Sequence, residues 1–218
     1  MIAITNYLED IRKRKIAAEE SSKLRRVYFK LTPEQFREIF TQECEIEMIK
    51  RNINKRFIVD DTNREAINQI YYYLIGSPQF NDRHEKSLII AGSIGTGKTI
   101  MANAICNMVL GLAEREMIRI HAKRLSSEII SKEEGFYDKK MLMIDDLGRE
   151  PKEANDFGNK STPMIDLFYH RYEIGSWTIA TTNFKLNTTL REFYGDTFYD
   201  RVIESFAVIE IKGESKRR

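Results

Sequence analysis

IAGSIGTGKTIMANAI, residues 90–105, is the stretch that decides the fold class of this chain. An apolar run over residues 88–91 leads into it, and Met101, Ile105 and Met108 follow at the spacing of one helix face. The glycines between these two patterns let the backbone turn sharply, because glycine adopts positive φ angles without a steric penalty. We therefore expect a buried strand, a glycine-rich turn and a helix in direct succession.

The turn matches the pattern G-x-x-x-x-G-K-[ST]. In such a turn, successive backbone N–H groups point inward at phosphate oxygens, and the N-terminus of the following helix adds a partial positive charge. Lys98 is expected to reach the β- and γ-phosphates of a nucleotide, and the Thr99 hydroxyl to hold Mg²⁺. A glycine-rich connector without a ligand is the alternative, and the flanking strand and helix argue against it. The candidate phosphate-binding residues are Gly92, Ser93, Ile94, Gly95, Thr96, Gly97, Lys98 and Thr99.

Four more short runs of apolar or β-branched residues follow, with helical stretches between most of them. They read MIRIHA (117–122), KMLMIDD (140–146), SWTIATTN (176–183) and AVIEIK (207–212). Nearly continuous hydrophobicity is typical of strands in a parallel sheet covered on both faces. Together with the first strand, these runs predict a doubly wound α/β fold with a parallel five-stranded sheet flanked by helices.

Two of these runs end in polar residues that suit a nucleotide site. Asp145 and Asp146 follow the apolar residues 141–144, at the strand end where open parallel sheets bind ligands. We expect Asp145 to hold Mg²⁺ and Asp146 to orient or deprotonate the attacking water. Asn183 ends another run, and its amide suits a hydrogen bond to a γ-phosphate or to that water. Ordinary turns after the two strands are the alternatives.

Composition indicates a globular chain. It has 218 residues, of which 42% are hydrophobic and 31% charged, and its net charge is only +2. No apolar run approaches the roughly 20 residues of a membrane helix, and the first residues lack the pattern of a secretory signal. Cys44 and Cys106 have no metal-ligand spacing with the histidines, so we expect buried thiols. These features favour a soluble, cytoplasmic protein.

The N-terminal region is expected to be helical and to form a separate unit over residues 1–55, ahead of the nucleotide-binding domain at 56–218. Its first 30 residues are dense in charge, which indicates either a helix with a solvated face or an arm that binds nucleic acid or a partner. A capping box is predicted at Thr32 and Gln35, with Pro33 in the first helical position, and a second one at Thr62 and Glu65.

From about residue 56 onward, the chain resembles the DnaC/IstB family of AAA+ ATPases, particularly the DnaC-like helicase loaders. The segments that carry the resemblance are GSIGTGKT (92–99), MLMIDDLGRE (141–150), FYHRYEIGSWTIATTNF (168–184) and YGDTFYDRVIESFAVIEIKGESKR (194–217). The resemblance implies an AAA+ P-loop fold with a small N-terminal helical region. It also implies ATP and ADP as ligands, Mg²⁺ as the metal, and assembly-dependent hydrolysis of ATP to ADP and phosphate.

The resemblance also implies roles for individual residues. Residues 92–99 are similar to the Walker A motif, Asp145 and Asp146 to Walker B, and Asn183 to sensor 1. Arg201 matches the arginine finger, which projects into the ATP site of a neighbouring subunit; a surface salt bridge is the alternative role for this side chain.

Two further roles follow from the resemblance. Arg217 resembles the arginine of a C-terminal G-x-S-x-R motif and is expected to contact the nucleotide as a second sensor. Phe57 and Ile58 lie where related ATPases build part of the adenine pocket, and packing in the core is the alternative.

The leading functional hypothesis is an ATP-dependent loader of a hexameric replicative helicase. Its N-terminal helices would hold the helicase, and its ATPase domains would self-associate through shared ATP sites and bind DNA, in single-stranded form. The alternative is an IstB-like helper ATPase whose client is a transposase. A small-molecule P-loop kinase is disfavoured, because no arginine-rich lid is evident. Residues 123–138 leave room for little more than one helix, so we do not expect the family's additional DNA-contacting element there.

Overall fold

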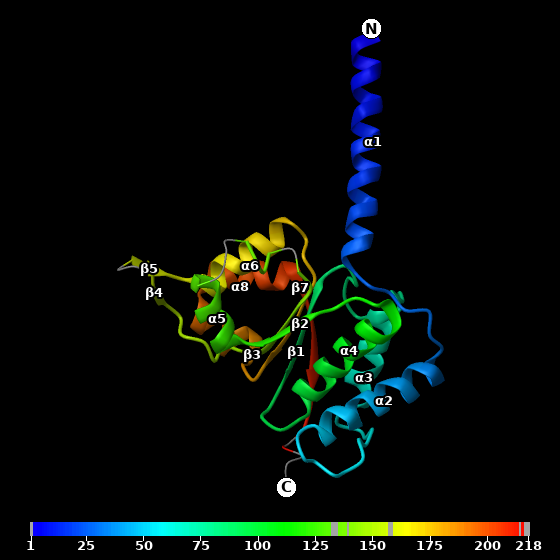
Figure 1. Cartoon of the computed structure of the whole chain (residues 1–218), viewed down its shortest axis with the longest axis vertical. Helices are drawn as coiled ribbons and strands as arrows, with labels where there is room; N and C mark the ends of the chain where they lie inside the picture. The colour runs from blue at the N-terminus through cyan, green and yellow to red at the C-terminus, as the bar shows by residue number, and fades with distance from the viewer. Residues whose placement is uncertain (1, 132–134, 139, 157–158, 214, 216–218) are drawn as a thin grey trace.

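The fold is centred on one parallel sheet of five strands. The computed structural model describes residues 2–131, 135–138, 140–156, 159–213 and 215. The strands lie side by side in the order β2-β3-β6-β1-β7 (Figure 1). Their bounds are β1 Ser87–Gly92, β2 Ile118–His121, β3 Leu142–Leu147, β6 Thr178–Thr182 and β7 Phe206–Ile211. All four neighbouring pairs are parallel, so the predicted five-stranded sheet is confirmed.

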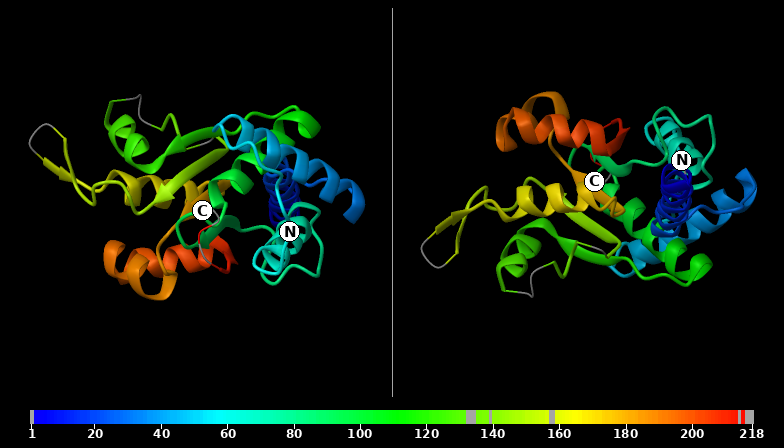
Figure 2. Two further views of the ribbon diagram at one scale, coloured as in Figure 1. Left: turned by 90° about the horizontal axis from the view of Figure 1, so that it is seen from below. Right: turned by 90° about the horizontal axis from the view of Figure 1, so that it is seen from above.

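Helices cover both faces of the sheet (Figure 2). Side chains alternate along β1, so Leu88 and Ile90 join one hydrophobic cluster, whereas Ile89 and Ala91 join the other. The first cluster includes side chains of α2 (Pro33–Ile49), α3 (Arg64–Leu74) and α4 (Lys98–Ala113). The second includes side chains of α5 (Ala122–Ser131), α6 (Pro163–Glu173), the π-helical turn η1 (Leu186–Leu190), α7 (Arg191–Tyr194) and α8 (Asp196–Ser205).

One of the two predicted helix starts is confirmed. The Thr32 hydroxyl accepts from the Gln35 backbone N–H at 3.2 Å, and the Gln35 side chain accepts from the Thr32 N–H at 3.0 Å. The predicted box at Thr62 and Glu65 is wrong, because α3 has Asn63 as its N-cap. The Thr62 hydroxyl instead donates to Asp60 at 2.6 Å, so a local turn uses the group that the box would need.

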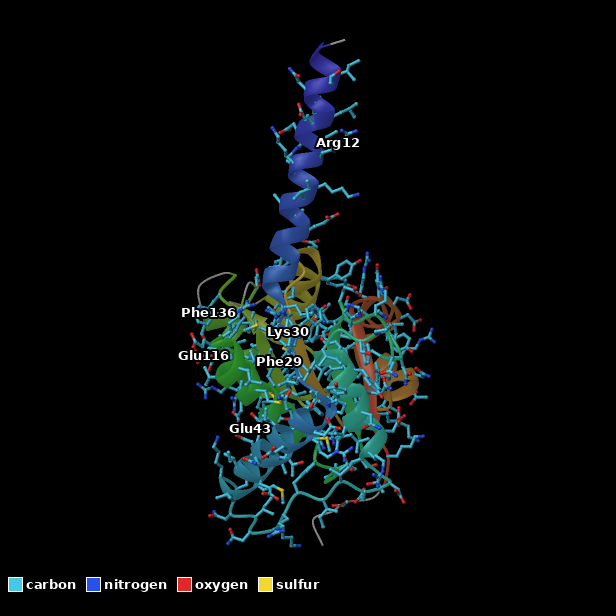
Figure 3. The ribbon with its side chains drawn as sticks, turned by 90° about the vertical axis from the view of Figure 1, so that its right-hand side faces the viewer. Arg12, Phe29, Lys30, Glu43, Glu116 and Phe136 are labelled. Atoms are coloured by element: carbon cyan, nitrogen blue, oxygen red, sulfur yellow. The ribbon has the colours of Figure 1, made fainter. Side chains whose placement is uncertain are left out.

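Helix α1 (Ile2–Arg25) projects away from the body (Figure 1). Figure 3 shows Arg12 on this helix, well clear of the other elements. The described side chains from residue 4 to residue 19 are all exposed, which agrees with a helix that has a solvated face. Among the residues that the structure describes, none of the helices combines the length and the apolar character needed to cross a bilayer.

Helix α2 belongs to the core beneath the sheet. Phe36, Phe40 and Cys44 of α2 lie in the same hydrophobic cluster as α4, and Glu43 accepts a hydrogen bond from Asn107 at 2.7 Å. The second half of residues 1–55 therefore packs on the domain that contains the sheet, whereas the described side chains of α1 are exposed. Cys44 and Cys106 are buried thiols, as predicted.

A short antiparallel hairpin projects from the side of the molecule that lies away from α2 (Figure 1). Its strands are β4 (Ala154–Asp156) and β5 (Asn159–Ser161), and they form a separate two-stranded sheet. The hairpin follows β3 in the chain and precedes α6.

Candidate nucleotide site

The glycine-rich turn has the backbone geometry that the sequence requires. Gly95 and Gly97 have φ angles of +86° and +95°, and α4 begins at the next residue, Lys98. The Thr96 hydroxyl donates to the Ser93 carbonyl at 2.9 Å and ties the turn together. A Cβ atom added to Gly95 would collide with Ser215 Oγ, so Ser215 lies directly against the turn.

Lys98 connects the turn to the neighbouring strand. Its ammonium group is almost fully buried and donates to the Ser93 carbonyl and to Asn183 Oδ1, both at 2.7 Å. Asn183 follows β6, which lies next to β1 in the sheet. The structure therefore brings together the predicted lysine of the turn and the predicted amide, which are 85 residues apart in the sequence.

Asp145 faces the start of α4. Its Oδ1 accepts from the Thr99 hydroxyl at 2.8 Å and from the Thr181 hydroxyl at 2.6 Å. Hydroxyl and carboxylate oxygens are hard ligands, and Mg²⁺ commonly uses one or two of them together with substrate phosphates and water. Thr99 and Asp145 thus fit the metal that the sequence predicts.

Asp146 has a backbone conformation that breaks the regular strand. Its φ angle is +56°, and the pairing of β3 with β6 shifts register between Ile144 and Leu147. The Asp146 N–H donates to Thr181 Oγ1 at 2.9 Å, and its Oδ1 accepts from Asn183 Nδ2 at 3.0 Å. Asn183 therefore contacts both Lys98 and Asp146, so three predicted residues form one connected network.

The loop after β3 is held by a buried carboxylate. Glu150 accepts from the Gly148 N–H at 2.9 Å and from the Tyr194 hydroxyl. Burial raises the pKa of Glu150, although three backbone N–H groups oppose that shift. These contacts anchor the segment that follows the two aspartates.

Sequence reasoning missed two side chains of the network. Thr181 bridges Asp145 and Asp146, and His121 lies beside Asp146 with Nε2 at 3.7 Å from Oδ2. Both stand at or near the end of a predicted strand. That position is the available sequence signal, because the carboxyl ends of parallel strands meet at one edge.

Arg201 lies outside this network. Its guanidinium forms a salt bridge with Glu204 at 3.0 Å and lies over the Tyr172 ring, at 5.2 Å from the ring centroid. The Glu204 carbonyl accepts from Arg83, which precedes β1. This cluster therefore lies near the amino-terminal end of β1, whereas the glycine-rich turn follows its carboxyl end. Half of the Arg201 side chain is exposed.

The remaining predicted residues have separate positions. Arg217 lies outside the described residues. Phe57 packs edge-on against Phe40, with ring centroids 6.3 Å apart, and Ile58 is exposed. Phe57 therefore packs in the core, which is the alternative that the sequence analysis gave for this residue.

No family model and no curated protein matches the sequence. Among solved structures, the DnaC helicase loader is similar with a TM-score of 0.52 and 20% identity, over 73% of this chain and 95% of that chain. A putative primosome component from Streptococcus pyogenes serotype M3 has a TM-score of 0.57 and 17% identity, over 90% and 97% of the two chains. Replication initiator DnaA bound to AMPPCP and single-stranded DNA has a TM-score of 0.55 and 18% identity, over 72% of this chain and 49% of that one.

At these low sequence identities, the structural similarities show the fold alone. The glycine-rich turn, the parallel sheet and the polar network at its carboxyl edge place the chain in the class of P-loop proteins with the AAA+ fold. The three structures named above are those of a helicase loader, a putative primosome component and a replication initiator, which agrees with the resemblance to the DnaC/IstB family. The chain spans about half of the DnaA structure and nearly all of the loader and primosome structures.

Proposed function

We propose that the chain binds ATP with Mg²⁺ and hydrolyses it to ADP and phosphate. The observation that carries this proposal is the network from Lys98 through Asn183 to Asp146, with Thr99 against Asp145 at its side. A purely structural turn needs no such convergence of an ammonium group, an amide and two carboxylates. Lys98 is buried and the other three groups are half-buried, and such convergent polar groups are typical of functional sites.

Each residue of the network has a role in this reaction. The N–H groups of the turn bind the phosphates, and Lys98 exchanges a protein acceptor for a phosphate oxygen. Thr99 and Asp145 would hold Mg²⁺, which neutralises charge on the phosphates when bound. Asp146 accepts the proton of the water whose oxygen attacks the γ-phosphorus, while the bond from that phosphorus to the ADP oxygen breaks. Asn183 orients this water or the γ-phosphate.

The arginine finger is proposed to act between subunits. Arg201 is half exposed and lies away from the chain's own glycine-rich turn, a position suited to a neighbour's site. A finger supplied in this way makes hydrolysis depend on self-association, since the transition-state charge is incompletely neutralised in a single subunit.

We propose that the client of this ATPase is a replicative helicase. The fold is similar to that of the DnaC helicase loader and of a primosome component, and the second similarity extends over 90% of this chain. Residues 1–55 are the proposed partner-binding region. Within them, α1 offers side chains that the body leaves exposed, including Ile4, Tyr7 and Leu8. Single-stranded DNA is proposed as a second partner, because a DnaA neighbour binds it.

Nucleotide binding is tested by calorimetry in magnesium buffer. The unsubstituted chain is expected to take up ADP and ATP, Lys98→Ala to lose most of its ATP affinity, and Asp146→Asn to bind ATP but hydrolyse it at least about a hundredfold more slowly. Lys55→Ala, an exposed lysine far along the chain from the network, is the control. No uptake of either nucleotide by the folded, unsubstituted chain would refute the proposal.

The client is tested by capture with the full chain. The immobilised protein is offered a purified hexameric helicase and, separately, a purified transposase. Helicase capture that is lost in the double substitution Tyr7→Glu and Leu8→Glu supports the loader proposal, because both side chains are exposed on α1. Capture of the transposase alone would assign the chain to an IstB-like role instead.

A further inference from the structure

Arg201 belongs to a cluster of three exposed side chains from two helices. Arg201 and Glu204 stand one helical turn apart on α8, and Tyr172 stands near the end of α6. The Arg201 guanidinium donates to Glu204 Oε2 at 3.0 Å, and the Tyr172 hydroxyl donates to Glu204 Oε1 at 2.6 Å. The guanidinium also lies over the Tyr172 ring, at 5.2 Å from its centroid. Each of the three side chains therefore contacts the other two.

This closed set of contacts restricts the orientation of Arg201. An exposed ion pair on a helix surface gives little orientation by itself, because long side chains keep many rotamers in water. Here the Tyr172 hydroxyl engages one oxygen of Glu204, so the other oxygen is turned toward Arg201. The ring of Tyr172 supports the face of the guanidinium. Because Tyr172 comes from another helix, the orientation of Arg201 depends on how α6 packs against α8.

The C-terminal end of α8 is held by two cations. The Glu204 carbonyl accepts from Arg83 at 3.3 Å, and the Ile203 carbonyl accepts from Lys86 Nζ at 3.0 Å. Cations at this position engage carbonyls that have no partner within the helix, and they interact favourably with the helix dipole. The helix end that carries Glu204 is therefore fixed on the segment that leads into β1.

One edge of the Arg201 guanidinium remains open. Nη1 donates to Glu204, whereas Nη2 and Nε have no hydrogen-bond acceptor among the residues that the structure describes. Half of the side chain is exposed. A guanidinium binds phosphate oxygens through N–H groups that point outward in one plane. The open edge is thus available to a phosphate from outside this chain while Nη1 stays on Glu204.

We propose that Tyr172 and Glu204 are positioning residues, which hold Arg201 in the orientation in which it enters the ATP site of a neighbouring subunit. A donor that is already in place costs no reorganisation when charge develops in the transition state. Neither residue touches the nucleotide, and both act through Arg201 alone. This inference rests on the proposed ATPase function and on the proposed role of Arg201 as the finger.

Substitutions of Tyr172 separate its two contacts. Tyr172→Leu removes the ring and the hydroxyl and is expected to lower kcat roughly tenfold. Its ADP affinity should be unchanged, because the subunit's own glycine-rich turn is intact. Tyr172→Phe keeps the ring beneath the guanidinium and is expected to lose only about threefold in kcat.

Glu204→Gln tests the carboxylate. The amide keeps one acceptor oxygen but no charge, and we expect kcat to fall by about threefold. A higher kcat in Glu204→Gln would show that the carboxylate restrains the finger instead of positioning it, and it would overturn the inference.

Tyr199 provides the matched control on α8. The Arg191 guanidinium lies over its ring at 5.6 Å from the centroid, and its hydroxyl donates to Asn187 Oδ1 at 2.7 Å. Tyr199→Leu removes an arginine–tyrosine contact of similar geometry that does not involve Arg201. It is expected to keep kcat within about twofold of the parent. The unfolding midpoint of every variant shows whether its fold is intact.

Mixed assemblies give a readout that a merely structural role would not move. Tyr172→Leu subunits keep an intact turn, and Lys98→Ala subunits keep an intact finger cluster. Their equal mixture is expected to hydrolyse ATP at least about threefold faster than the sum of the two proteins measured separately. A defect confined to the nucleotide site of the Tyr172→Leu subunit itself would not be rescued in this way.

A combined variant completes the test. Tyr172→Leu added to Arg201→Ala should cause no further loss, because a positioning residue acts only through its partner. Full kcat in Tyr172→Leu or in Arg201→Ala, a mixture without rescue, or an additive loss in the combined variant would each overturn the inference. If the parent hydrolyses ATP and Arg201→Ala is slow but Tyr172→Leu is not, the ATPase and the finger survive alone. If the folded parent takes up no nucleotide, all three proposals are refuted.

Discussion

Asn183 illustrates how much one side chain decides at the residue scale. Its amide oxygen accepts from Lys98 and its amide nitrogen donates to Asp146, so one group contacts the positive and the negative part of the site. A carboxylate at this position would have two acceptors and no donor toward Asp146, and an alkyl group would have neither. The neutral amide is therefore the side-chain type that this geometry requires.

Gly95 provides a test of the turn at the same scale. Gly95→Ala is expected to lower ADP affinity roughly ten- to hundredfold, because a non-glycine residue at φ +86° costs about 1–3 kcal/mol and the added Cβ would meet Ser215. Without nucleotide, the turn of the variant can relax and lose this strain. Nucleotide binding forces the turn back into the strained conformation, so the strain lowers the affinity. Calorimetry with ADP measures the loss. Gly111→Ala, in α4 with open space around it, should leave affinity unchanged; equal affinity of both variants would contradict the argument.

Glu47 makes the stability sensitive to acid. Burial opposes its ionisation, but hydrogen bonds from Lys50, Arg51 and Asn107 outweigh burial and lower the pKa from 4.5 to about 2. A depressed pKa stabilises the folded state above the unfolded value, and this contribution disappears as pH falls from about 4.5 toward 2. After a discount for the solvent that screens Lys50, the contribution of Glu47 to the free energy of unfolding is on the order of 2 kcal/mol.

The matching experiment is urea unfolding of the parent and of Glu47→Gln at pH 7 and pH 3. The variant should be less stable at pH 7 by about 2 kcal/mol, and the difference should shrink at pH 3. Glu38→Gln, an exposed position on the same helix, is the control. A difference that is equal at both pH values would exclude this role of Glu47.

At the scale of elements, local sequence signals were reliable where no neighbouring side chain competed for the same group. The capping box at Thr32 forms because its partners are three residues away and exposed to solvent. The predicted box at Thr62 fails because Asp60 accepts from the Thr62 hydroxyl first. Strand β3 likewise follows its predicted apolar run. The left-handed conformation of Asp146 was not predicted, because the position is occupied by neither glycine nor asparagine.

The cap of α2 can be measured. Thr32→Ala is expected to reduce the free energy of unfolding by about 1 kcal/mol, because the N–H of Gln35 loses its acceptor at an exposed helix start. Thr32→Ser keeps the hydroxyl and should remain within a few tenths of a kcal/mol of the parent. Urea midpoints at constant slope report both values. Identical midpoints for the alanine and serine variants would show that the cap does not stabilise α2.

At the scale of the whole molecule, two features point outward. Helix α1 extends from the body with its described side chains exposed (Figure 1). Arg201 lies with Glu204 and Tyr172, away from the glycine-rich turn. Neither contributes to the network around Lys98. Both are therefore available to other subunits or partners in the proposed assembly.

Mixing two inactive variants tests the shared site. Lys98→Ala removes the ammonium group proposed to bind phosphate, and Arg201→Ala removes the proposed finger. Each alone should hydrolyse ATP at a small fraction of the parent rate, and their mixture should recover part of it, because some interfaces then combine an intact turn with an intact finger. Arg191→Ala, a surface arginine paired with Asp196, should retain parent activity. A mixture no more active than its components would contradict transfer of Arg201 between subunits.

The sequence by itself determined the glycine-rich turn, the five strands, the helix start at Thr32 and the polar residues at the strand ends. These features depend on neighbours within a few residues or on the alternation of side chains, which hydrophobicity and backbone preferences record directly.

The tertiary structure alone decided which of these residues meet. The order β2-β3-β6-β1-β7 places Asn183 beside Lys98 and His121 beside Asp146, although the chain separates them widely. It also packed α2 onto α4 and directed Arg201 away from the turn. Strand order and helix docking result from burying one shared core, a requirement of the whole chain that no short segment encodes.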